Sequence, residues 1–96
     1  MSTDLATDLA NALLSAAPEI VWRDVGGDLV LFDPRSGDYH ALNASASFVW
    51  RRIARGEGVA AIVAEAAASH PDQADAIARD VRAFVESALA IGLLRA

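Results

Sequence analysis

The stretch GDYHALNASASFVW, residues 37 to 50, decides the fold of this chain. It predicts an extended segment, Asp38 to Leu42, that turns at Asn43 into an amphipathic helix. Asn43 is a favourable N-cap, because its side-chain oxygen can accept a hydrogen bond from a free backbone N–H in the first helical turn. The helix that follows has one apolar stripe at positions i, i+3, i+4 and i+7: Ala46, Val49, Trp50 and Ile53. A strand that ends in a capped helix fixes a small sheet against a helical layer.

Two further strands are predicted before this segment. Ile20 to Val25 alternates apolar and polar residues as a half-buried strand does, and Asp28 to Asp33 (DLVLFD) is a second apolar run. Gly26 and Gly27 predict a two-residue hairpin turn between them, since glycine reaches the positive φ that such turns require. Asp33 to Gly37 predicts the next turn. The three strands therefore form an antiparallel meander whose first and third strands are edges.

The rest of the chain is predicted to be helical. Helices are expected from Ala44 to about Arg55, from about Val59 to Ala68, and from Asp72 to about Ile91, with Asp72 as the N-cap of the last one. Leu93 and Leu94 are expected to fold back onto the core. Together with the meander, these helices predict an α+β fold of the winged helix-turn-helix type, with a three-stranded antiparallel sheet followed by three helices.

An extra N-terminal helix is predicted for residues 4 to 16, where leucines recur at every fourth position. Residues 1–18 would then be a helical extension and residues 19–96 the winged domain. The extension either packs on its own domain or offers a surface to a partner or to a second copy.

Composition narrows the classes of function. Ninety-six residues, 54% of them apolar, predict one small domain with a packed core. A net charge of −5 opposes general binding to phosphate backbones, and the absence of lysine removes Schiff-base chemistry. Without cysteine there is neither a disulfide framework nor a thiolate metal site. No apolar run approaches the roughly 18 residues of a membrane span, and the acidic N-terminus lacks a signal core. We therefore expect a cytoplasmic protein with no membrane association.

The last helix is expected to form a groove with the third strand. One apolar stripe of this helix is predicted to enter the core: Ile77, Val81, Phe84 and Ala88. A second apolar flank lies beside it, with Arg82 at its margin: Ala74, Ala78, Val85 and Leu89. The opposite flank is small or polar: Ala76, Asp80, Ala83 and Ser87. An edge strand beside an apolar groove suits an extended peptide, which adds a strand through main-chain hydrogen bonds. The alternative is that the second flank packs on the first helix or on the N-terminal helix.

A set of motifs between residues 28 and 94 carries a family resemblance. They are DLVLFD, GDYHALN, the helix with Val49-Trp50, the Arg55-Gly56 helix stop, the Ile62-Val63 helix and the closing pattern from Val81 to Leu94. The most specific part is Tyr39-x-Ala41-Leu42-Asn43 followed by Phe48-x-Trp50. In these features the chain resembles the PqqD-like peptide chaperones, the RiPP recognition elements (RREs) of natural product biosynthesis by ribosomal-peptide pathways.

The resemblance implies a peptide-binding adaptor that is not an enzyme and needs no cofactor. Members of that family bind the leader of a precursor peptide as a strand added to the third strand of the sheet. In this chain the third strand is 38–42, and the leader would lie beside the third helix. They present the peptide to a modifying enzyme such as a radical-SAM enzyme, a peptidase or a cyclase. Carried over by position, the contacts fall mainly on the backbone of four residues and on four helical residues: Tyr39, His40, Ala41, Leu42, Ala78, Arg82, Val85 and Leu89. One departure from the family is Glu57-Gly58, which stands where a Ser or Thr helix cap is expected.

No catalytic or metal-binding constellation is apparent in the sequence. His40 shares the face of Leu42 and is expected to be a half-buried core histidine, whereas His70 is expected at a solvated helix end. Two histidines on separate elements, without cysteine, do not favour a metal site. The serines lie in turns or at helix starts without a nearby base, so none is a candidate nucleophile. Trp22 and Trp50 are both expected in the core.

Two other functions fit the same fold. A winged-helix DNA-binding regulator would use the last helix for recognition, but that helix carries more acidic than basic residues and would be repelled by phosphates. A protein–protein docking module without a peptide substrate is the other possibility. A homodimer is also possible, because an exposed edge strand can pair with a second copy.

Overall fold

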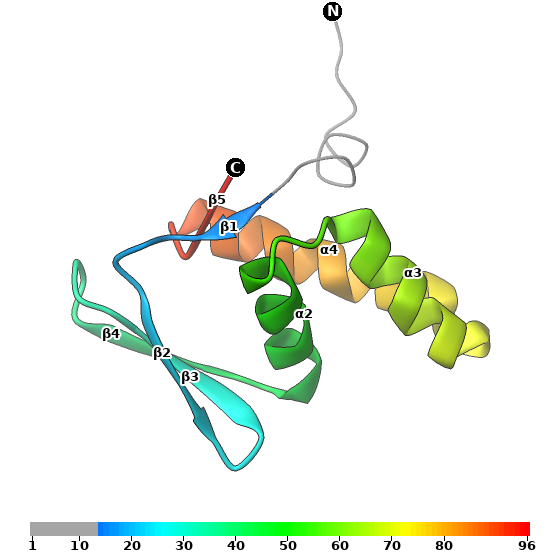
Figure 1. The fold of residues 1–96 in the computed structure, drawn as a ribbon, viewed down its shortest axis with the longest axis horizontal. Coiled ribbons are helices and arrows are strands. Elements are labelled where there is room, and N and C mark those ends of the chain that lie inside the picture. Colours follow the sequence, from blue (N-terminus) through cyan, green and yellow to red (C-terminus); the bar gives the residue numbers. More distant parts are fainter. Residues whose placement is uncertain (1–13) are drawn as a thin grey trace, which may run out of the picture.

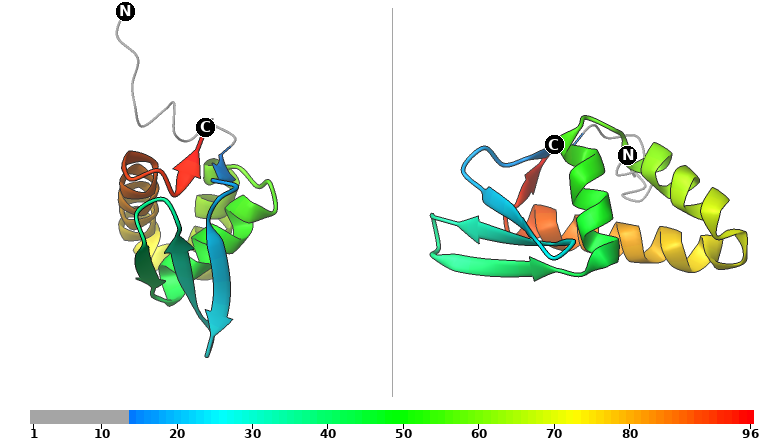
Figure 2. Two further views of the ribbon diagram at one scale, coloured as in Figure 1. Left: turned by 90° about the vertical axis from the view of Figure 1, so that its left-hand side faces the viewer. Right: turned by 60° about the horizontal axis from the view of Figure 1, so that its bottom comes forward.

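The computed structural model describes residues 14–96 of the chain (Figures 1 and 2). The elements follow in the order β1 Ser15–Ala16, β2 Val21–Val25, β3 Asp28–Asp33, β4 Asp38–Leu42, α2 Ala44–Ala54, α3 Val59–Ser69, the 3-10 helix η1 Pro71–Gln73, α4 Ala74–Ala90 and β5 Leu94–Arg95. The sheet lies on one side of the molecule, α3 and α4 extend to the other, and α2 stands between them (Figure 1). The predicted α+β arrangement, a three-stranded antiparallel sheet followed by three helices, is confirmed.

Both hairpins of the meander form as predicted. The strand order is β2-β3-β4, and both pairs are antiparallel. Gly26 and Gly27 have φ of +64° and +94°, as a primed two-residue turn requires. Gly37 has φ +77°, and its N–H donates to the Asp33 carbonyl at 2.8 Å. The second turn therefore ends in a glycine of positive φ, and the register of β3 and β4 continues directly from it.

The core forms between the inner face of the sheet and the helices. The Asn43 side chain accepts the Ala46 N–H at 2.9 Å, which confirms the predicted N-cap of α2. The α2 stripe then buries Val49, Trp50 and Ile53. These side chains meet the buried face of β3 and the closing residues of the chain: Leu29, Leu31, Leu93 and Leu94.

The expected burial of both tryptophans is right for Trp50 and wrong for Trp22. Trp50 is fully buried, whereas Trp22 is 41% exposed. The Trp22 ring packs edge-on against Trp50, with 6.3 Å between the ring centroids. Trp22 faces inward, but β2 is an edge strand, and in residues 14–96 no further strand covers its open side.

The predicted N-terminal helix is wrong at its C-terminal end. Ser15 and Ala16 form the strand β1, which pairs with β5, and the Ala17 N–H donates to the Leu93 carbonyl at 2.9 Å. The backbone that returns after α4 therefore pairs with this segment and replaces helical hydrogen bonds there. The rest of that prediction, residues 4 to 13, lies outside the described residues. The domain boundary after residue 18 stays a prediction.

The start of α4 also differs from the prediction. Asp72 is not its N-cap but lies inside η1, because Pro71 begins a tight turn in which the Gln73 N–H donates to the His70 carbonyl at 3.0 Å. The helix then runs from Ala74 to Ala90. Gly92 follows with φ +81°, and the buried Leu93 and Leu94 confirm the predicted fold-back. Within the described part of the chain, no helix has the length and apolar character needed to span a membrane.

Candidate functional site

The outer edge of β4 has no strand partner among the residues that the structure describes. It ends the three-stranded sheet, and among residues 14–96 no strand pairs with its outer side, since β1 pairs with β5 instead. In an antiparallel pair, alternate residues direct their N–H and C=O groups toward the partner strand. The two-residue turn makes Val25 and Asp28 a hydrogen-bonded pair. Counting along β3 from Asp28, the residues that direct their groups toward β4 are Leu29, Leu31 and Asp33.

The same alternation decides which backbone groups of β4 are available. The partners of those three β3 residues use their backbone groups within the sheet: Leu42, His40 and Asp38. The residues between them, Tyr39 and Ala41, direct their N–H and C=O groups outward, away from β3. These are the groups that an added strand would pair with.

Ser47 fixes the end of this edge to α2. The Leu29 N–H donates to Ser47 Oγ at 2.9 Å, and the Ser47 hydroxyl donates to the Leu42 carbonyl at 3.1 Å. Ser47 is 0% exposed, so this bridge between β3 and β4 lies inside the core. Sequence reasoning did not single out Ser47. The available signal was a small polar residue on the buried side of α2, one turn after the N-cap.

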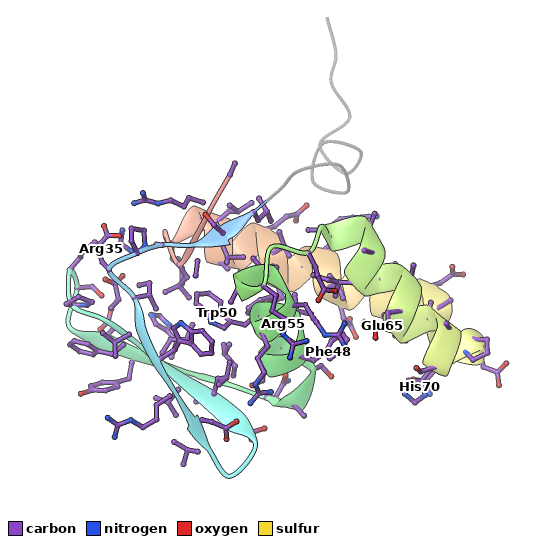
Figure 3. The ribbon with its side chains drawn as sticks, viewed as in Figure 1. Arg35, Phe48, Trp50, Arg55, Glu65 and His70 are labelled. Carbon is purple, nitrogen blue, oxygen red and sulfur yellow. The ribbon has the colours of Figure 1, made fainter. Side chains whose placement is uncertain are left out.

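A groove of about 860 Å³ opens where β4 passes into α2. It lies between the start of α2, the end of α3 and the first half of α4. Its apolar lining comes from α2 and α4: Phe48, Val49, Ile77, Val81 and Phe84. Its polar lining includes Asn43, Arg52, Glu65, His70 and Asp80. Phe48 and Glu65 lie in the space between α2 and α3, and His70 lies at the far end of α3 (Figure 3).

Arg52 forms one wall of this groove and joins α2 to α3. Its Nη2 donates to Glu65 Oε1 at 3.0 Å, its Nη1 donates to Glu57 Oε1 at 3.2 Å, and its guanidinium lies 4.8 Å from the centroid of the Phe48 ring. Hydrogen bonding to Glu65 is the main reason that the pKa of Arg52 is raised above its ordinary value. The arginine therefore stays charged and holds the α2–α3 wall in place.

Both ends of β4 lie near α4. At its beginning, the β3–β4 turn contacts the end of α4, where Arg35 Nη2 donates to the Gly92 carbonyl at 2.7 Å. At its end, Asn43 lines the groove together with Asp80 and Phe84 of α4. In the left view of Figure 2, β4 is the strand of the sheet that lies on the α4 side. The outer edge of β4 thus ends at Asn43, which lies at the rim of the groove, and we treat the edge and the groove together as the candidate site.

The predicted β4 contacts occupy different surroundings. Tyr39 is 70% exposed on the outer face, where its ring packs on Phe32 with 4.7 Å between centroids, and Ala41 is exposed on the same face. His40 is half-buried on the inner face, as predicted, and Leu42 is buried. The backbones of Tyr39 and Ala41 are therefore the accessible part of this set.

The predicted α4 contacts lie on the flank that does not line the groove. Val85 is 0% exposed, so its side chain belongs to the core and is no accessible groove wall. Ala78, Arg82 and Leu89 are also absent from the groove lining, and Leu89 packs against the core. The groove is lined instead by the stripe of Ile77 and Phe84 and by Asp80 from the opposite flank. A helical wheel could not show this, because the groove forms where α2 and α3 meet α4, and the wheel does not place these helices. Contact of the predicted residues with a peptide stays a prediction.

Comparison with known proteins relates the chain to one family and to two solved structures. The family model of Coenzyme PQQ synthesis protein D (PqqD) matches residues 28–94. The solved structure of a lasso peptide synthetase B1 complexed with the leader peptide is 27% identical, with a TM-score of 0.79 over 88% of this chain and 100% of that one. TbiB1 in complex with the TbiA(beta) leader peptide shares the fold, at 23% identity and a TM-score of 0.77 over 84% of this chain and 94% of that one. No curated protein matches the chain.

Proposed function

This chain belongs to the PqqD family, and we propose that it is a non-catalytic adaptor that binds the leader of a ribosomally made precursor peptide. The leader adds a strand to the outer edge of β4 and places side chains in the groove beside α4. The observation that carries this proposal is the outward-facing backbone of Tyr39 and Ala41, on a strand that ends beside an apolar groove. The lasso peptide synthetase B1 of similar fold was solved with a leader peptide, which supports the same kind of guest here.

The β4 edge and the groove are expected to contribute differently to the free energy of binding. Each main-chain hydrogen bond to the guest contributes about 1 kcal/mol net, and each well-buried apolar anchor about 2 kcal/mol. Ordering a flexible peptide costs about 2–5 kcal/mol of the gross interaction. Backbone pairing alone therefore gives weak and unselective binding, so the side chains in the groove supply most of the specificity.

The adaptor would pass its guest to a separate enzyme. A radical-SAM enzyme, a peptidase or a cyclase suits this role, since each can act on a peptide substrate. The proposal places the encounter in the cytoplasm, where ribosomes release the precursor. A second copy of the chain would compete with the guest, because it can pair with the same β4 edge.

A titration with matched variants tests the proposal. The probe is a fluorescently labelled peptide that spans the leader half of the precursor encoded nearest this gene, followed by anisotropy. Ala41→Pro removes an outward N–H without removing a bond to β3, as an edge proline can, and Phe84→Ala removes part of the apolar lining. Val25→Ala, at an exposed position on the opposite edge strand, is the control.

The expected result is binding by the wild type and by Val25→Ala, with clear loss in the two site variants while their circular dichroism is unchanged. Duplex DNA at low salt is included as a second probe. A wild-type chain that ignores the peptide but binds DNA in a salt-sensitive way would favour a DNA-binding regulator instead. Undiminished binding by Ala41→Pro would exclude strand addition at β4.

A further inference from the structure

Arg35 joins the β3–β4 turn to the end of α4. Its Nε and Nη2 donate to the two carboxylate oxygens of Asp33 at 2.9 and 3.1 Å, and Nη2 also donates to the Gly92 carbonyl at 2.7 Å. Among residues 14–96, this is the one hydrogen bond between the β3–β4 hairpin and the segment from α4 to Gly92. Figure 3 shows Arg35 beside this turn, at the opposite end of the molecule from His70.

Asp33 fixes the direction of the Arg35 side chain before it reaches α4. Asp33 is 5% exposed, and its carboxylate also accepts a hydrogen bond from the Arg35 backbone N–H at 2.9 Å. The guanidinium is therefore held by two bonds within the turn, in the fork geometry that arginine and carboxylate form. A long side chain that is held in this way loses little further entropy when it binds a third group.

The Gly92 carbonyl is a suitable third group. Gly92 follows Ile91, the C-cap of α4, near the helix end where backbone carbonyls lack helical partners and where a positive charge is favourable. Gly92 has φ +81°, and a Cβ at this position would lie 3.3 Å from Arg35 Nη2. The contact therefore depends on glycine at 92 and on arginine at 35.

We propose that Arg35 is a positioning residue that holds the edge of β4 at a fixed separation from α4 and thereby sets the affinity for a guest strand. This inference rests on the proposed function, since the guest strand must fit between β4 and α4. An added strand lies about 4.8 Å from its neighbour, so a shift of the hairpin relative to α4 misplaces either the backbone pairing or the groove contacts. Arg35 acts through this spacing and not by touching the guest.

Arg51 provides a matched control because it forms hydrogen bonds to the turn of the other hairpin, β2–β3. Its Nη2 donates to Asp24 Oδ2 at 2.6 Å and to the Gly27 carbonyl at 3.0 Å, which ties the β2–β3 turn to α2. Like Arg35, it is an arginine bound to an aspartate and a glycine carbonyl, although Arg35 Nη1 also lies 3.8 Å from Glu19 Oε2, and the Arg51 contact lies on the opposite hairpin from the β4 edge. Arg51→Gln therefore removes comparable hydrogen bonds without altering the separation of β4 and α4.

The experiment compares Arg35→Gln, Arg35→Lys and Arg51→Gln with the wild type in two measurements. The first is the Kd for the labelled leader peptide. The second needs no peptide: nitroxide labels on cysteines introduced at the exposed Ser36 and Ser87 report the hairpin–α4 distance by electron paramagnetic resonance, and the chain has no cysteine of its own. Gly92→Ala perturbs the same contact from the α4 side and replaces Arg35→Gln in both measurements if that variant unfolds.

We expect Arg35→Gln to weaken peptide binding by about tenfold or more and to broaden the interspin distance, because pre-organisation of the site is lost. Arg35→Lys keeps the positive charge but loses the forked guanidinium, so its peptide affinity and interspin distance distribution should lie between those of the wild type and Arg35→Gln. Arg51→Gln should change neither measurement by more than about twofold. Wild-type binding that Arg35→Gln leaves intact, or an unchanged distance distribution, overturns this inference alone. Absence of peptide binding by the wild type refutes the proposed function and this inference with it.

Discussion

Replacement of Ser47 by alanine removes the hydroxyl that bridges β3 and β4 inside the core. In the wild type this group accepts the Leu29 N–H at 2.9 Å and donates to the Leu42 carbonyl at 3.1 Å, and Ser47 is fully buried. Leu29 and Leu42 are also buried, so water cannot replace the lost partner easily. The substitution therefore leaves a backbone donor and a backbone acceptor without the hydroxyl that served both.

The expected loss follows from these two groups. A buried backbone group left without a partner costs about 1–3 kcal/mol, and relaxation of the strand ends recovers part of that. We expect Ser47→Ala to lower the free energy of unfolding by about 2–4 kcal/mol, a large share of the roughly 5–15 kcal/mol that small domains possess. Urea unfolding measures this as a lower midpoint with an unchanged m-value.

Ser45→Ala is the control, because Ser45 lies in the same first turn of α2 but is exposed. It should alter the free energy of unfolding by no more than about 0.5 kcal/mol. A loss below about 0.5 kcal/mol for Ser47→Ala would refute the reasoning, since the Leu29 N–H and the Leu42 carbonyl would then pair without the hydroxyl.

Three further predictions concern the turns and helix ends. The hydrogen bond from Arg35 holds the pKa of Asp33 below its ordinary value of 3.8, so this carboxylate contributes stability above that pH and loses it as the pH falls through the lowered value. Asp33→Asn should therefore show a shallower fall in thermal midpoint below about pH 4 than the wild type does, and equal slopes would contradict this. Gly92→Ala should cost about 1–2 kcal/mol in urea unfolding, because φ is +81° and the new Cβ meets Arg35 Nη2; a neutral effect would show that the turn relaxes. Gly58→Ser should add about 0.3–1 kcal/mol, since α3 has no side-chain N-cap bond, and Gly58→Ala, which lacks the hydroxyl, should not reproduce the gain.

Several features of the candidate site could be predicted from the sequence because they depend on neighbours along the chain. The bounds of β3 and β4, the Asn43 cap and the glycine turns follow from backbone preferences of a few consecutive residues. The alternation of β4 also placed His40 on the inner face with Leu42. Local chemistry and periodicity were sufficient for the edge strand itself.

The helical side of the site could not be predicted in the same way. Periodicity identifies which α4 residues share a face, but not which neighbouring element each face meets. Val85 and Phe84 are adjacent in the sequence and both apolar, yet one is buried in the core and the other lines the groove. The exposure of Trp22 could not be predicted either, because it depends on whether another element covers the edge strand β2, and none does within residues 14–96.

The sequence by itself determined the three strands of the meander, their glycine turns, the Asn43 cap of α2 and the order of these elements, since they depend on contacts within a few residues. The tertiary structure alone decided the pairing of β1 with β5, the Ser47 bridge, the Arg35 contact with Gly92 and the side of α4 that lines the groove. Each of these joins groups that are distant in the chain. Such pairings depend on how the packed elements fit together, which no local preference of the residues encodes.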